Sequence, residues 1–201
     1  PKLMELVQHR SISYGEHECI DVPKWQPILE EVSLPEEANA YYTKVVESVI
    51  AAKGNLQEMK NAFMRMRQLS SGFLGFRNDE SGKRVEIAFA ENPKLERLLD
   101  VLSELPDGRK AVVYHDFTFS GKTIYSRLKD IGLQGVWIWG GTKDASELQK
   151  RFQEDPQCRV AVLNSQVGAY SLDGLQEVAN YTMFYESPVG VLPREQANKR
   201  L

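Results

Sequence analysis

The sequence predicts an α/β protein: a doubly wound, mostly parallel sheet that follows a helical hairpin. After residue 93, four apolar runs lack the polar alternation of a half-exposed strand, and helix-length segments separate most of them. Such strands are buried on both faces and pair in parallel. Before residue 92, two amphipathic stripes of helical period are joined by a short polar break. We therefore expect a sheet of about four to six strands with helices on both faces.

Three segments are predicted along the chain. Residues 1–32 show weak periodicity and contain Pro23 and Pro27, which indicates an extended connecting segment. Residues 33–92 are predicted to form a helical protrusion, and residues 93–201 the α/β unit. Because the sequence begins at Pro1 and stops inside a helical pattern, we expect it to be a piece of a longer polypeptide.

The helical hairpin is predicted from its start signals and its two stripes. Ser33 is a capping residue followed by an early Pro35, with Glu36 three positions on. The first stripe consists of Ala38, Tyr41, Tyr42, Val45, Val46, Val49 and Ile50. Gly54 and Asn55 interrupt it, and the second stripe consists of Leu56, Met59, Phe63, Met66, Leu69 and Phe73.

The α/β unit alternates predicted helices and strands. Asn92 and Pro93 start a leucine-rich helix, Gly132 ends a second one, and Asp144 with Glu147 forms a capping box for a third. The apolar strands are residues 110–114, 135–139, 159–163 and 181–185.

Composition limits the function classes. The formal charge of −3 argues against a polybasic nucleic-acid binder, although the stretch 53–84 holds seven basic residues against three acidic ones. That cluster is either a solvated face or a surface that contacts phosphates. Two cysteines cannot form a disulfide scaffold, which favours a reducing compartment, and no apolar run is long enough to span a membrane.

A short match to a phosphate-binding loop occurs at Ser120–Thr123, between a predicted strand and a predicted helix. The full pattern needs a glycine where this sequence has Asp116, and Phe117 and Phe119 are bulky where backbone N–H groups would surround phosphate oxygens. We predict an ordinary helix start here and no metal site, because the three histidines lie far apart in the sequence.

The last third carries a constellation of small and charged residues. Asn164–Gln176 follows an apolar strand, and small residues at a carboxyl end let the backbone approach a ligand. Further on, Gln196 and Arg200 are four positions apart, so a helix would place both on one face. An arginine presented in this way can neutralise charge on a phosphate held by another surface.

In these residues and several others, the chain resembles the C-terminal RecA-like lobe of a Swi/Snf-type superfamily-two helicase of the bacterial or phage kind. The order of the matches agrees from about residue 15 to the end. The matching segments are Cys19–Pro23 (the linker between lobes), Arg67–Phe73 (the protrusion helix), Lys110–Phe117 (motif IV), Gly141–Thr142 with Phe152, Ser165–Gln176 (motif V) and Gln196–Arg200 (the start of motif VI).

The sequence also departs from that family. Ala169 and Ser171 replace two glycines of motif V, and the chain stops after the first arginine of motif VI. The lobe that carries the Walker A and DEAD/DEAH boxes is absent from this sequence.

The resemblance implies a motor lobe of an ATP-dependent double-stranded DNA translocase, active as a hydrolase only within the full-length enzyme. In that scheme ATP and Mg are bound mainly by the absent N-terminal lobe, and this lobe closes over them. It implies Arg200 and Gln196 as catalytic residues and Gly168 and Asp173 at the nucleotide cleft. The implied DNA contacts are Ser165, Gly141, Thr142, Arg65 and Arg67.

The implied partners are double-stranded DNA and the N-terminal lobe of the same polypeptide, with no membrane. The implied location is the cytoplasm of a bacterial or phage-infected cell, or the nucleus in a eukaryote. Two other classes stay open at this point. One is a self-contained phosphotransferase that uses Lys122 and Thr123, and the other is a non-catalytic α/β interaction module.

Overall fold

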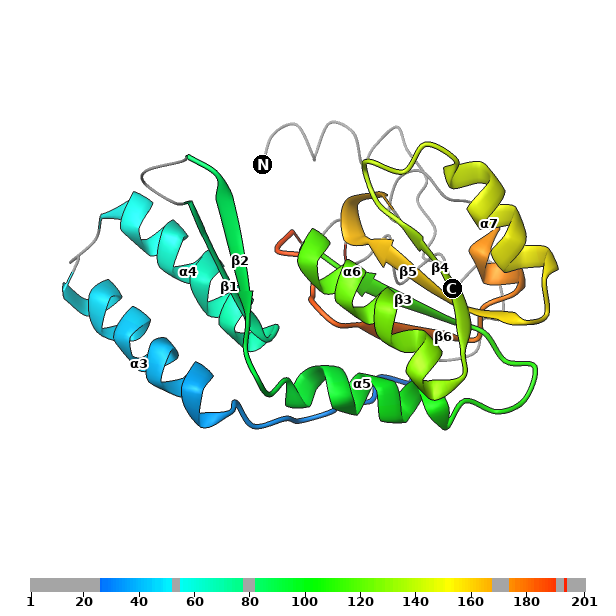
Figure 1. Cartoon of the computed structure of the whole chain (residues 1–201), viewed down its shortest axis with the longest axis horizontal. Helices are drawn as coiled ribbons and strands as arrows, with labels where there is room; N and C mark the ends of the chain where they lie inside the picture. Colours follow the sequence, from blue (N-terminus) through cyan, green and yellow to red (C-terminus); the bar gives the residue numbers. More distant parts are fainter. Residues whose placement is uncertain (1–25, 52–54, 78–81, 168–173, 191–193, 195–201) are drawn as a thin grey trace, which may run out of the picture. The chain divides into compact units, whose positions relative to one another are not determined.

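The computed structural model describes residues 26–51, 55–77, 82–167, 174–190 and 194 (Figure 1). The chain divides into two compact units, Pro1–Glu31 and Val32–Leu201. In the first unit, residues 26–31 form neither helix nor strand; the expected linker match at Cys19–Pro23 lies outside the described residues. The second unit holds every helix and strand described below.

The predicted helical hairpin is confirmed. Helices α3 (Glu36–Ala51) and α4 (Leu56–Ser70) lie side by side (Figure 1). Asn55 starts α4, because its side chain accepts hydrogen bonds from the N–H groups of Gln57 and Glu58 at 3.0 and 3.3 Å. A small apolar cluster that includes Ala38 and Leu69 holds the two helices together.

The end of α4 differs from the prediction. The apolar stripe extends to Phe73, but α4 stops at Ser70 and Phe73 begins strand β1 (Phe73–Arg77), which pairs antiparallel with β2 (Arg84–Ala88). Gly72 explains the break: its φ is +86°, and a Cβ there would overlap the side chain of Asn92. The predicted helical protrusion over residues 33–92 therefore also contains a β-hairpin, which the sequence analysis did not predict.

The predicted parallel sheet is confirmed, with four strands. All neighbouring strands pair in parallel, in the order β4-β5-β3-β6. Every residue of the central β3 is fully buried, which is why its sequence shows no polar alternation. The strands are β3 (Ala111–His115), β4 (Gln134–Ile138), β5 (Cys158–Asn164) and β6 (Tyr181–Phe184).

Helices cover both faces of the sheet, as expected. One face packs against α5 (Pro93–Ser103), α6 (Thr118–Arg127) and the 3₁₀ turn η1 (Leu128–Ile131). The other packs against α7 (Ala145–Glu154) and the 3₁₀ turn η2 (Leu175–Glu177). The predicted start of α5 is confirmed, because Asn92 accepts from the Leu95 N–H at 3.1 Å. Asp144 stands at the start of α7, but its side chain makes no capping hydrogen bond, so the expected capping box is not formed.

The connections leave the two central strands toward opposite faces. β3 continues into α6 on one face, whereas the chain after β5 brings Leu175 of η2 to the other. In doubly wound sheets the carboxyl ends of two such strands border a crevice in which ligands bind. The residues that follow β3, β5 and β6 are therefore the candidate site.

Candidate functional site at the carboxyl edge of the sheet

Glu186 occupies the start of helix α6. Its side chain is 4% exposed, and one carboxylate oxygen accepts from the N–H groups of Asp116 and Phe117 at 2.7 and 3.1 Å. The other oxygen accepts from the hydroxyl of Ser120 in the first turn. The N-cap residue of α6, Phe117, makes no side-chain capping hydrogen bond, and this carboxylate from beyond β6 lies against the N-cap instead.

This arrangement explains why Ser120–Thr123 is not a phosphate loop. A phosphate loop needs free N–H groups just before and at a helix start. Here the Glu186 carboxylate occupies this place and accepts from the N–H groups of Asp116 and Phe117, just before α6. Ser120 and Gly121 lie inside α6, and the Gly121 N–H donates to Phe117 O at 3.1 Å. The prediction of an ordinary helix start is therefore confirmed.

Arg67 reaches this edge from α4. Its Nη2 donates to the carboxylate of Asp116, the residue after β3, and to the carbonyl of Ser187 at 2.8 Å. The side chains of Arg67 and Asp116 are only 15% and 18% exposed. One guanidinium thus connects the protrusion helix to the ends of β3 and β6.

The ends of β3 and β5 are joined by side-chain hydrogen bonds. Asn164 donates from Nδ2 to the carbonyl of Asp116 at 3.1 Å. Ser165 is fully buried, and its hydroxyl donates to the carbonyl of His115 at 3.1 Å. A phosphate bound by this hydroxyl would have to replace that hydrogen bond.

His115 is held as a neutral imidazole. Its Nδ1 lies 3.0 Å from the carbonyl of Phe117, which can only accept, so Nδ1 carries the proton. Its Nε2 accepts from the indole N–H of Trp137 at 3.1 Å. Burial lowers the pKa of His115 below its ordinary value of 6.5, although the nearby carboxylates of Glu186 and Asp116 raise it in part. Gly121 is required beside this pair, because a Cβ there would overlap both rings.

We expect the free energy of unfolding to fall as the pH is lowered from about 7.5 to about 5.5. The unfolded chain takes up a proton at His115 near pH 6.5 and the folded protein only at lower pH, so stability is lost below about 6.5, by at most about 1.4 kcal/mol per pH unit. Urea unfolding of the wild type and His115→Gln measures this, because glutamine keeps a donor and an acceptor but does not titrate. Equal pH slopes for the two proteins would contradict the assignment.

The residues predicted to contact DNA lie in different surroundings in the structure. Arg65 is exposed, whereas Arg67 points to the sheet edge, since positions two apart lie about 200° apart around a helix. Gly141 and Thr142 follow β4 in a turn closed by the Thr142 N–H, which donates to Trp139 O at 2.9 Å. The Thr142 hydroxyl accepts from the Trp139 N–H at 3.0 Å. DNA contact by these residues stays a prediction.

The predicted residues for nucleotide and catalysis, Gly168, Asp173, Gln196 and Arg200, lie outside the described residues, and their roles stay predictions. The residues that the sequence analysis missed are Glu186, as a cap, and the Arg67–Asp116 ion pair. A signal was present: an acidic residue follows both the β3 and the β6 segments closely. The contact between the two acidic residues and the helix start could not be predicted without knowing that β3 and β6 are neighbours in the sheet.

The described residues do not by themselves fit ATP with Mg. The start of α6 is filled by Glu186, and the described ranges contain no cluster of three or more His, Cys, Asp or Glu residues that could hold a metal ion. Within the same ranges, none of the helices combines the length and apolar character that a membrane span requires.

Comparisons with known proteins agree with this architecture. No protein-family profile matches the sequence, and no curated protein matches it. The Sulfolobus solfataricus SWI2/SNF2 ATPase C-terminal domain is similar in structure, with a TM-score of 0.58 and 17% identity over 76% of this chain and 68% of that one. The SWI2/SNF2 ATPase core domain of the same organism gives a TM-score of 0.61 and 16% identity over 82% of this chain.

A third similar structure is the Sulfolobus solfataricus SWI2/SNF2 ATPase core in complex with double-stranded DNA, with a TM-score of 0.56 and 17% identity over 76% of this chain. The chain spans only 35% and 32% of the two core structures. The chain thus has the fold of the C-terminal RecA-like lobe of Swi2/Snf2 ATPases.

Proposed function

We propose that this chain is the C-terminal motor lobe of an ATP-dependent double-stranded DNA translocase of Swi/Snf type, from a bacterium or phage. The observation that carries the proposal is the shared fold, which covers 76% and 82% of this chain in the two similar structures. A similar structure is a core in complex with double-stranded DNA, which supports DNA as the partner here.

The chemistry of the site supports a lobe that works with a second one. Phosphoryl transfer needs a phosphate cradle and a carboxylate that holds magnesium. The one helix start that resembles a cradle is filled by Glu186, so we place ATP and Mg on the N-terminal lobe. Arg200 and Gln196 then act on the γ-phosphate, and Gly168 and Asp173 line the cleft between the lobes. The site of action is the bacterial or phage-infected cytoplasm, or the nucleus of a eukaryote.

The occupied helix start weighs against the phosphotransferase alternative. Lys122 is exposed, and the Thr123 hydroxyl donates to the carbonyl of Phe119 at 2.9 Å, as in an ordinary helix. No contact of the described residues favours the non-catalytic alternative over the motor.

The test is DNA-stimulated phosphate release, measured for the 201-residue chain and for the longer polypeptide that carries both lobes. We expect no turnover above buffer from the chain alone and DNA-dependent turnover from the two-lobe protein. Turnover by the chain alone would show that it holds its own ATP site. A two-lobe protein that neither binds DNA nor hydrolyses ATP would support an interaction module instead.

A further inference from the structure

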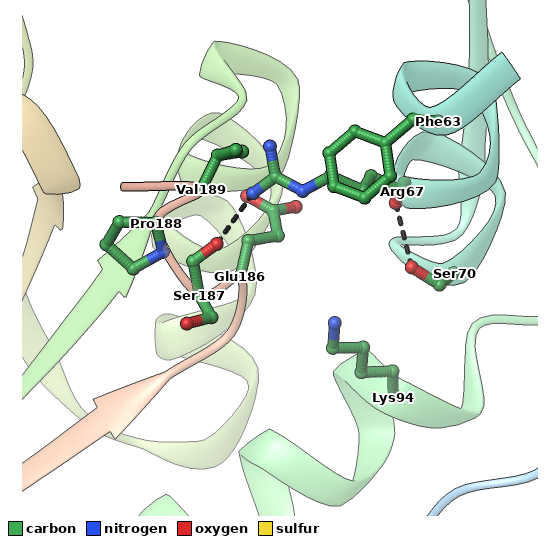
Figure 2. A pocket seen from close by; sticks show the side chains of 8 residues that line it. All are labelled: Phe63, Arg67, Ser70, Lys94, Glu186, Ser187, Pro188 and Val189. Carbon is green, nitrogen blue, oxygen red and sulfur yellow. Dashed lines mark hydrogen bonds between the residues drawn. The ribbon is translucent and has the colours of Figure 1, made fainter. Parts of the chain in front are cut away.

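A pocket of about 390 Å³ lies beside the candidate site (Figure 2). Its walls come from helix α4, from Lys94 near the start of α5 and from the segment 186–189 after β6. Figure 2 shows the Lys94 ammonium on one side of the pocket and the Arg67 guanidinium on the opposite side. The proposed ATPase role does not assign a ligand to this pocket.

The Lys94 ammonium has no oxygen partner among the described residues. It lies 4.7 Å from the centre of the Tyr185 ring, and within the described ranges no carboxylate or carbonyl is at hydrogen-bond or ion-pair distance. Burial lowers the pKa of Lys94, an effect that nearby Glu186 opposes and Arg67 reinforces. A half-buried ammonium whose N–H groups find no oxygen acceptor among the described residues is costly unless an anion approaches it.

One carboxylate, that of Glu186, lines the pocket, and Asp116 lies beside it. Glu186 accepts three hydrogen bonds at the start of α6, and Asp116 is paired with Arg67. Neither forms an ion pair with Lys94 within the part of the chain that the structure describes. Among the described residues, the Lys94 ammonium is therefore near one carboxylate but not paired with it, so an anionic ligand can still approach it.

Arg67 is a second cation of the pocket, and some of its N–H groups make no hydrogen bond within the described residues. Both of its hydrogen bonds leave from Nη2, and within the described residues no hydrogen bond leaves from Nε or Nη1. A guanidinium opposite an ammonium suits a ligand with several anionic oxygens rather than one carboxylate. Phe63, which is 44% exposed, supplies an apolar wall on the same side as Arg67.

We propose that this pocket binds a phosphate group, which is contacted by Lys94 on one side and by Arg67 on the other. Two sources share this chemistry: a phosphodiester of a nucleic-acid backbone and the terminal phosphate of a free nucleotide. The inference rests on the pocket alone, so it does not depend on ATP hydrolysis by the longer polypeptide.

The test uses the full chain and three probes: inorganic phosphate, ADP and a short DNA duplex, each compared with potassium chloride at equal ionic strength. NMR of lysine labelled at the ε-carbon reports on Lys94 directly. A bound phosphate group favours the charged form, so we expect the Lys94 signal to shift and its pKa to rise. Binding affinity is measured by calorimetry in parallel.

Lys94→Gln should weaken binding of the recognised probe by about tenfold or more, whereas Lys94→Arg should retain most of the affinity. The matched control is Lys150→Gln, because Lys150 is an exposed lysine on α7, outside the pocket. If the source is a DNA backbone, Lys94→Gln also lowers the slope of log affinity against log salt by about 0.9. If it is a nucleotide, ADP binding weakens and duplex binding does not.

Two results would overturn the proposal. One is a wild-type Lys94 signal that none of the three probes moves beyond the chloride control, a result that needs no variant to fold. The other is equal affinity of Lys94→Gln and Lys150→Gln for every probe.

Discussion

Replacing Arg200 with alanine in the polypeptide that carries both lobes is expected to lower ATP turnover by about 10³–10⁵-fold. In the proposed motor, Arg200 stabilises charge that develops on the transferring γ-phosphate, so its contact strengthens in the transition state. Nucleotide affinity should therefore fall much less than turnover. The measurements are DNA-stimulated phosphate release and binding of a fluorescent nucleotide.

Two further variants make the Arg200 result specific. Arg200→Lys keeps the charge but loses the planar fork, so it should recover little turnover. Lys199→Ala is the matched control, because the neighbouring position is not specified by the motif that Gln196–Arg200 resembles. Wild-type turnover from Arg200→Ala would show that the motor has been assigned wrongly.

Replacing Glu186 with alanine is expected to destabilise the chain by about 3–5 kcal/mol, since it leaves buried donors unpaired at the start of α6. The donors are the N–H groups of Asp116 and Phe117 and the hydroxyl of Ser120. Urea unfolding measures the loss. Glu154→Ala is the control: it removes an exposed partner of Lys150, which should change stability by at most about 1 kcal/mol.

A second measurement separates the capping role of Glu186 from simple loss of packing. The variant leaves the N–H groups of Asp116 and Phe117, just before α6, without their acceptor, so that they can bind an anion. Added phosphate should therefore stabilise Glu186→Ala more than it stabilises the wild type. A loss below about 1 kcal/mol, or no difference in the response to phosphate, would contradict the capping role.

Local patterns in the sequence predicted most of the secondary structure. The apolar strands, the Asn92 start of α5 and the Gly132 end of η1 depend on contacts within a few residues, and the structure confirms all of them. The end of α4 was mispredicted because it depends on contacts with residues far along the chain. The helical period continues through Phe73, and only the packing of Gly72 against Asn92 and of Phe73 against Phe119 ends it.

The candidate site was predicted only in part. The sequence placed it at the carboxyl ends of parallel strands, and the fold agrees. Phosphate contact by Ser165 stays a prediction, and within the fold its hydroxyl donates to the carbonyl of His115. It offered Arg65 and Arg67 as one basic surface, yet Arg67 pairs with Asp116.

By itself, the sequence determined the fold class, the parallel sheet and the helical hairpin, because hydrophobic period and capping residues act over short distances. Only the tertiary structure decided which charged side chains are paired or hydrogen-bonded within the fold. Glu186 and Asp116 are 70 residues apart, and they meet because β6 pairs with β3 in parallel register. Because of that pairing, the Glu186 carboxylate lies at the start of α6, where the sequence resembles a phosphate loop. The ammonium of Lys94 then has no oxygen partner among the described residues.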